Sequence, residues 1–235
     1  MKQQAQRFIH KTYRGLGTNI YFTAFGSANS KDLDDSYALL KEYESALTVN
    51  QDHSELMAVN QAAGIRPISV SDATYQLTKL AIQTSQENFG FNALIGPLVK
   101  LWKIGFKGAS LPPKEEITSR LALIDPTQVE LDDNEFSIFL KQAGMQLDLG
   151  AIAKGYIADR IQDLWEAKGI SSGMINLGGN LLLKGQAPHH PDGLWRIGIQ
   201  DPFTKRGNAI LSVKFGPCSA VTSGIYERLL KIKGK

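Results

Sequence analysis

The sequence contains a single cysteine, Cys218, and no long hydrophobic run. One thiol forms neither an intramolecular disulfide nor a cysteine-based zinc site. A membrane-spanning helix needs about 18 consecutive apolar residues, so none is predicted. Residues 1–12 also lack the apolar core of a secretory signal and a cysteine for lipidation. We therefore expect a cytoplasmic protein as written, and an exported or membrane-anchored one if a signal preceded this sequence.

A strong excess of charge of either sign is also absent. The 26 Lys and Arg residues nearly balance the 23 Asp and Glu residues, which leaves a net charge of +3. This balance argues against a nucleic-acid-binding protein. A hydrophobic content of 43% over 235 residues is enough for a sizeable core. Since no repeat or linker interrupts the chain, we expect a single domain over residues 1–235.

The common catalytic motifs are missing as well. There is no HExxH, Walker, GxSxG or dinucleotide-binding glycine motif. The four histidines lie in polar segments, and the His189–His190 pair stands between two prolines. An exposed loop is the preferred interpretation of that pair over a metal site. These absences leave the catalytic residues unknown.

Hydrophobic patterning predicts an α+β fold with a largely antiparallel sheet flanked by helices. Helices are expected from Ser30, from near Ser71, after Pro112–Pro113, and from Asp148 to about Lys168. A hairpin is expected where two short apolar runs flank residues 132–134. The predicted strands are 19–25, 129–131, 136–140, 174–177, 180–185, 195–199, 209–215, 219–222 and 226–232.

The segment Leu147–Asp159 (LDLGAIAKGYIAD) is the most informative in the chain. Small residues crowd the expected first turns, so a ligand can approach the helix backbone closely. The free N–H groups of a helix N-terminus favour a pyrophosphate, and Lys154 adds a cation. The alternative is purely structural: Asp148 caps the helix and the small residues allow tight packing.

Three further glycine-containing segments, 15–18, 176–180 and 222–224, fall at predicted strand ends. Each suits contact with a ligand, and segments 176–180 and 222–224 equally suit a bulge or tight turn. For residues 15–18 a turn is the preferred interpretation.

The order and spacing of these segments together resemble the ApbE family, and the resemblance covers nearly the whole chain. The helix DLGxIAKGYxxD, the strand end NLGG and the strand TSGxYER form a specific combination, although each is weak alone. The segments are RGLGT (14–18), SELMAVN (54–60), FNALIGPLVKLW (91–102), LDLGAIAKGYIAD (147–159), INLGGN (175–180), WRIGIQDP (195–202) and VTSGIYER (221–228). The resemblance implies an ApbE-like, T-fold-like domain.

It also implies a function. Members of the family use FAD as substrate with Mg2+ and transfer the FMN half to a Thr or Ser hydroxyl of a target flavoprotein. Two alternatives stay open: an FAD pyrophosphatase that releases FMN and AMP, and a non-catalytic homologue that binds FAD or a partner. A third alternative also stays open, namely an α+β domain whose glycines have only a structural role.

The resemblance assigns site residues by position. The backbone carbonyl of Ala151 matches a Mg2+ ligand, which suits a hard cation. Leu16 stands where the family often has Met, Asn50 where an aromatic residue often covers the flavin, and Asn92 where Asp is more common. The implied FAD-contacting residues are Leu16, Asn50, Gly90, Phe91, Asn92, Asp148, Lys154, Thr222 and Ser223.

The family pattern continues for several dozen residues past TSGxYER, with further Mg2+ ligands and the expected catalytic base. This sequence stops at Lys235. We therefore expect a domain truncated at its C-terminus, either a fragment or a natural truncation, with weak or no transferase activity.

Overall fold

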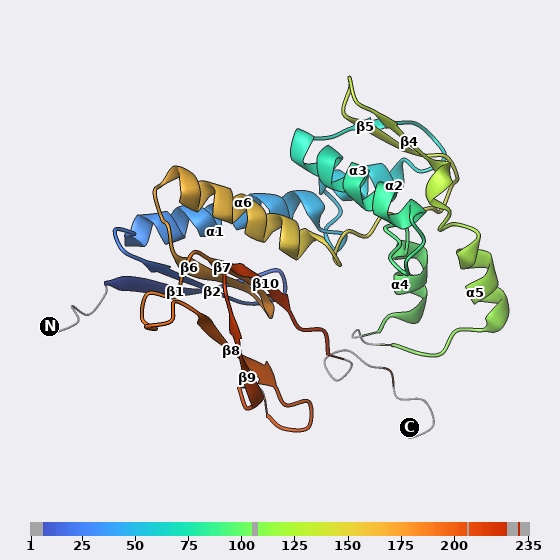
Figure 1. The fold of residues 1–235 in the computed structure, drawn as a ribbon. Coiled ribbons are helices and arrows are strands. Elements are labelled where there is room, and N and C mark those ends of the chain that lie inside the picture. Colours follow the sequence, from blue (N-terminus) through green and yellow to red (C-terminus); the bar gives the residue numbers. More distant parts are fainter. Residues whose placement is uncertain (1–6, 105–107, 206, 225–229, 231–235) are drawn as a thin grey trace, which may run out of the picture. The chain divides into compact units, whose positions relative to one another are not determined.

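The computed structural model describes residues 7–104, 108–205, 207–224 and 230, and it contains the mixture of helices and antiparallel strands expected from the sequence (Figure 1). The chain divides into two compact units. Unit 1 comprises residues 1–44 and 154–226, and unit 2 comprises residues 45–153 and 227–235. Each unit is described by itself. No helix in the described part of the chain is both long and apolar enough to cross a membrane.

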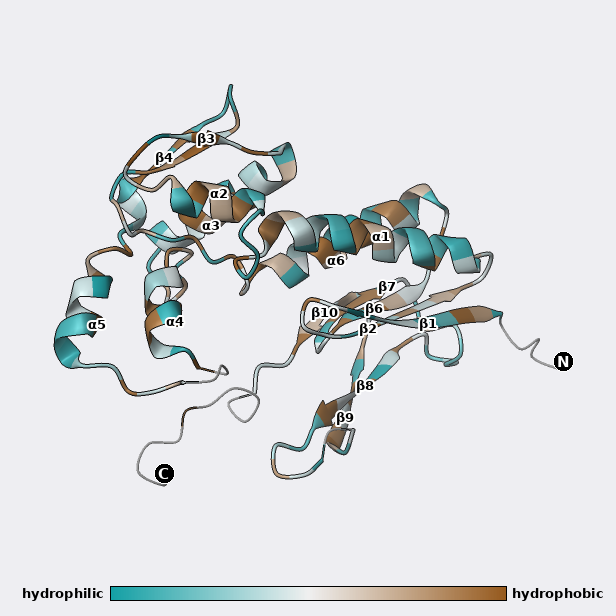
Figure 2. Ribbon diagram, turned by 180° about the vertical axis from the view of Figure 1, so that it is seen from behind, coloured by the Kyte–Doolittle hydropathy of each residue, from teal (hydrophilic) through white to brown (hydrophobic). Residues whose placement is uncertain are grey.

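Unit 1 is built on a five-stranded antiparallel sheet with the strand order β1-β2-β6-β7-β10. A separate two-stranded ribbon pairs β8 with β9. The apolar part of β9 appears brown in Figure 2, and Ile210 is 62% exposed there. The strands are β1 (Phe8–Gly15), β2 (Thr18–Phe25), β6 (Gly173–Leu177), β7 (Asn180–Lys184), β8 (Trp195–Gln200), β9 (Ala209–Phe215) and β10 (Cys218–Val221).

Two helices, α1 (Ser30–Leu47) and α6 (Ala153–Ala167), lie on one face of this sheet (Figure 1). Their apolar stripes and the inward residues of β2 and β6 form one buried core, including Leu33, Phe22 and Trp165. The Trp165 indole N–H donates to Ser36 Oγ at 2.8 Å, so the polar atom of this buried ring is satisfied. Burial of this core is the main contribution to the stability of unit 1.

The sequence analysis missed β1, because this edge strand alternates polar residues with half-buried ones and has no continuous apolar run. β1 joins β2 through a two-residue turn, Leu16–Gly17, with φ angles of 52° and 70°. Positive φ at both positions matches the hairpin turn whose twist suits antiparallel strands. The turn interpretation of residues 15–18 is therefore confirmed.

Unit 2 contains four helices and a three-stranded sheet of order β3-β5-β4 among its described residues. The expected hairpin is present as β4 and β5, and the helix expected near Ser71 begins with the Ser71 side chain accepting from Thr74 N. The elements are α2 (Glu55–Gln61), β3 (Ile68–Ser69), α3 (Asp72–Gln86), α4 (Gly96–Trp102), α5 (Lys114–Leu121), a 3-10 turn (Pro126–Gln128), β4 (Val129–Asp132) and β5 (Ser137–Leu140).

Two expectations about helices were wrong. The short helix α2 was not predicted, although Ser54 caps it in the ordinary way by accepting from Met57 N at 3.0 Å. The helix expected from Asp148 begins at Ala153 instead. Asp148 Oδ1 accepts from Gly150 N at 2.9 Å, which closes a local turn before the helix starts. The strand predicted at 226–232 lies outside the described residues, apart from residue 230.

Candidate functional site

In unit 1, the candidate site residues gather at one end of the five-stranded sheet. The β1–β2 turn, which carries Leu16, lies at this end, as do the β6–β7 turn and the end of β10. Thr222 follows β10 directly, and its N–H donates to Gly179 O at 3.3 Å. Thr222 and Ser223 are both exposed. The sheet thus places Leu16 and Thr222 at the same end, with β6 and β7 between β2 and β10.

The N-terminus of α6 faces the same end of the sheet. Near the other end, Glu166 of α6 pairs with Lys184 at 3.4 Å, and a Cβ on Gly173 would overlap Trp165. Gly173 and Lys184 are register partners at the far ends of β6 and β7. Because α6 lies along the sheet (Figure 1), its first turn, with half-buried Lys154, lies toward the β6–β7 turn.

Glycines at this end of the sheet leave the backbone uncovered by side chains. Gly178 and Gly179 have φ angles of 68° and 93° and form the β6–β7 turn, which Asn176 Oδ1 supports by accepting from Gly179 N at 2.9 Å. A Cβ on Gly179 or on Gly155 of α6 would meet no atom within 4 Å. Open space therefore borders both the glycine turn and the first turn of α6, where the helix dipole favours an anion.

In unit 2, hydrogen bonds tie the loop around Asn92 to the segment that carries Asp148. Asp148 N donates to Ala93 O at 2.8 Å, and Ala93 N donates to Ser85 Oγ at 2.9 Å. Asn92 Nδ2 donates to Ile124 O at 2.7 Å, and Asn92 Oδ1 accepts from Leu94 N at 2.8 Å. A carboxylate has no N–H for Ile124 O, which gives a structural reason for Asn at a position where Asp was the commoner expectation.

A buried asparagine that the sequence analysis did not single out supports the same segment. Asn60 of α2 donates to Leu147 O at 3.0 Å and accepts from Leu147 N at 2.7 Å. Its signal in the sequence was a polar side chain on the apolar face of a short helix, beside Leu56 and Val59. Asn60 holds the irregular segment that leads into the Asp148 turn.

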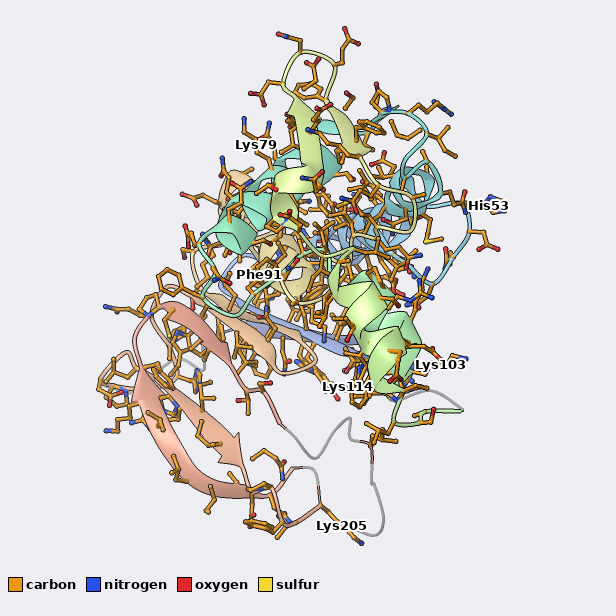
Figure 3. The ribbon with its side chains drawn as sticks, turned by 90° about the vertical axis from the view of Figure 1, so that its right-hand side faces the viewer. His53, Lys79, Phe91, Lys103, Lys114 and Lys205 are labelled. Carbon is orange, nitrogen blue, oxygen red and sulfur yellow. The ribbon has the colours of Figure 1, made fainter. Side chains whose placement is uncertain are left out.

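The remaining candidate residues of unit 2 are more open. Gly90 is exposed with a φ of 89°, and Phe91 is half-buried (Figure 3). Asn50 and Ala151 are exposed. The partial or full exposure of these four positions leaves them accessible to a ligand. Asn50 N donates to Thr48 Oγ1 at 3.2 Å, which is a local contact within its loop.

Unit 2 also has a cavity of about 440 Å³ that none of the predicted residues lines. It lies beside α4 and α5, whose facing ends carry the labelled Lys103 and Lys114 in Figure 3. Gln146 Oε1 in its wall is sealed from solvent without a hydrogen-bond partner. The cavity is lined by Pro97, Lys100, Leu101, Lys103, Ser110, Pro112, Pro113, Glu116, Arg120, Gly144 and Gln146.

The described residues do not form a metal site by themselves. No group of three or more His, Cys, Asp or Glu side chains in this part of the chain is placed to hold an ion. The Ala151 carbonyl alone does not fit the six oxygen ligands that Mg2+ requires. His53 is exposed and points outward from the loop before α2 (Figure 3).

Comparison with known proteins places these features in a family. A model described as the ApbE family matches residues 16–235. An FAD:protein FMN transferase of Klebsiella pneumoniae is 46% identical over 200 residues, and one of Treponema pallidum is 37% identical over 216 residues. The matches cover 85% and 86% of this chain but 61% and 59% of those relatives, so the chain spans about three fifths of their length.

The fold agrees with this match. The crystal structure of the ApbE protein from Thermotoga maritima superposes with a TM-score of 0.86 at 23% identity, covering 97% of this chain and 74% of that one. The predicted α+β, ApbE-like fold is confirmed.

Proposed function

Because this chain belongs to the ApbE family, we propose that it binds FAD and takes part in transferring the FMN half to a Thr or Ser hydroxyl of a target flavoprotein. The observation that carries the proposal is the glycine-rich end of the unit 1 sheet, where glycine turns and the α6 N-terminus border open space. A phosphate-bearing ligand suits such a place, since N–H groups and a helix dipole replace its hydration.

The residues proposed to contact FAD are those that the resemblance implies. In unit 1 these are Leu16, Lys154, Thr222 and Ser223. In unit 2 they are Asn50, Gly90, Phe91, Asn92 and Asp148. We propose that both units serve a single flavin-transferase domain.

The reaction would exchange the phosphoanhydride bond of FAD for a phosphoester bond to the acceptor. The acceptor hydroxyl oxygen bonds to the FMN phosphorus, the bond from that phosphorus to the AMP oxygen breaks, and AMP leaves. The hydroxyl proton passes to a base, which the described residues do not identify. Positioning of the pyrophosphate and stabilisation of its charge are the main contributions that a protein makes to such a transfer.

The Mg2+ requirement is part of the proposal, with the Ala151 carbonyl as one ligand. Since no described cluster completes the coordination shell, we propose that the other ligands come from FAD, from water or from residues outside the described set. Removal of Mg2+ should therefore affect transfer more than it affects FAD binding.

The decisive first experiment is titration of the chain with FAD, with and without Mg2+, followed by flavin fluorescence. Saturable binding supports the proposal, and absence of binding contradicts it. Product analysis then distinguishes the two chemical outcomes. FMN attached to a Thr-containing acceptor peptide indicates transfer, and free FMN with AMP indicates the pyrophosphatase alternative.

A further inference from the structure

Asn180, the first residue of β7, has a buried side chain with no hydrogen bond. It is only 8% exposed, and its Nδ2 atom is sealed from solvent without a partner. A buried amide donor left unpaired is destabilising, because it loses its hydrogen bond to water without gaining another, so such groups are rare in folded proteins. This one calls for a partner that the described chain does not supply.

The direction of the Asn180 side chain follows from the strand period. Alternate residues of a strand share a face, so Asn180 lies on the same face as Leu182 and Lys184. Leu182 belongs to the core beneath α1 and α6, and Lys184 pairs with Glu166 of α6. Asn180 therefore faces α6, at the end of the sheet where the helix begins.

The surroundings of Asn180 at this end of the sheet are partly open. It follows Gly178–Gly179 directly, and its register partner Val221 is 65% exposed. The open space next to Gly179 and Gly155 adjoins the same turn and the same helix end. The amide thus stands at the border between the buried core and this open region.

The amide can turn toward that open region. Only Nδ2 is sealed, and no hydrogen bond of either amide atom holds the side chain in one orientation. The terminal torsion of Asn is broad and roughly two-fold, so a half-turn exchanges the positions of N and O with little strain. After that half-turn the N–H donor occupies the position of Oδ1, which is not sealed from solvent.

We infer that Asn180 is a further binding residue of the site, donating a hydrogen bond from Nδ2 to a phosphoryl oxygen of FAD beside the N-terminus of α6. This inference rests on the proposed function. Asn180 thereby orients the pyrophosphate from the sheet side. Because its amide is unpaired when no ligand is bound, the unliganded protein is less stable than a variant with an apolar residue at this position.

The test is the pair of variants Asn180→Leu and Asn180→Asp, titrated with FAD and with riboflavin, which has no phosphate. The expected result for Asn180→Leu is FAD affinity about tenfold weaker, from loss of a hydrogen bond to a charged group, with riboflavin affinity unchanged. Asn180→Asp should weaken FAD binding further, because it places a carboxylate beside phosphate. The control Asn134→Leu, in the exposed β4–β5 turn, should leave FAD binding unchanged.

Thermal unfolding without ligand separates binding from structure. We expect Asn180→Leu to unfold at the same or a higher temperature than wild type, since it removes an unpaired donor. FAD affinity within twofold of wild type would overturn the inference. So would equal losses for FAD and riboflavin, or a lowered unfolding temperature with a matching loss of affinity. A wild-type chain that binds no FAD refutes the proposed function, and this inference with it.

Discussion

Asn60 and Leu147 are joined by two hydrogen bonds, one in each direction, although they are 87 positions apart in the sequence. The side-chain amide of Asn60 pairs with the backbone of Leu147 as a neighbouring strand would. Leu147 immediately precedes Asp148, so α2 determines where the proposed FAD-contacting turn lies within unit 2.

Asn60→Ala should lower the free energy of unfolding by about 2–4 kcal/mol, because it leaves the buried N–H and C=O of Leu147 unpaired. Chemical denaturation measures this loss. The adjacent Gln61→Ala, which removes an exposed side chain, should change stability by less than about 0.5 kcal/mol. Equal effects of the two substitutions would contradict the role assigned to Asn60.

Asp148 offers a way to separate turn formation from ligand binding. Asp148→Asn keeps an oxygen acceptor for Gly150 N and should leave stability near wild type, whereas Asp148→Ala should lower it by about 1 kcal/mol. If the carboxylate contacts FAD, both variants bind FAD less tightly, and Asp148→Ala loses more affinity than the lost hydrogen bond with Gly150 N explains. Thermal unfolding and FAD titration of both variants decide this. A change in stability alone would count against a cofactor role.

Lys168 joins α6 to α1 by pairing with Asp32 at 3.0 Å and Asp35 at 2.7 Å. The Asn29 backbone N–H, followed by Lys168, lowers the pKa of Asp32, and Lys168, followed by Lys31, lowers the pKa of Asp35. A carboxylate with a lowered folded-state pKa contributes stability above its unfolded pKa. That contribution is lost as the pH falls below about 4.

We therefore expect the unfolding temperature of wild type to fall below pH 4, with a shallower fall for Lys168→Met. Thermal unfolding from pH 6 to pH 2.5 measures both slopes. The control Lys205→Met removes an exposed lysine (Figure 3) and should retain the wild-type slope. Identical slopes for Lys168→Met and wild type would show that the ion pairs of Lys168 contribute nothing to acid sensitivity.

The two glycines of the β6–β7 turn should respond differently to alanine. Both have positive φ, but a Cβ on Gly178 would overlap the Thr18 side chain, whereas a Cβ on Gly179 meets no atom within 4 Å. We expect Gly179→Ala to destabilise by about 1 kcal/mol through backbone strain alone, and Gly178→Ala to destabilise by more. Thr18→Ala should recover part of the Gly178→Ala loss. No recovery in the double variant would exclude the Thr18 contact as the cause.

If the chain transfers FMN as proposed, the reaction should require Mg2+, because a cation neutralises the charge that develops as the pyrophosphate bond breaks. A transfer assay with an acceptor peptide, run with Mg2+ and with EDTA, measures this. Transfer that EDTA abolishes and added Mg2+ restores supports the requirement. Transfer that proceeds equally well in EDTA would contradict it.

The sequence by itself determined the fold class and the family. Strands such as 174–177 and 209–215 were predictable because their apolar and β-branched residues are local signals, and the spacing of the glycine segments indicated the ApbE pattern. The small residues around Lys154 and its cationic side chain also favoured an anion at the N-terminus of a helix. These inferences depend only on neighbours within a few positions along the chain.

Only the tertiary structure decided which of these residues meet. The start of α6 moved from Asp148 to Ala153, because Asp148 closes its own turn and its N–H is bound by Ala93 from a distant loop. Edge strand β1 was not predicted from the residue pattern, since it is stabilised by pairing with β2 and has no apolar run of its own. The Asn60–Leu147 pair and the unpaired amide of Asn180 likewise depend on long-range packing, because burial decides whether a polar group needs a partner.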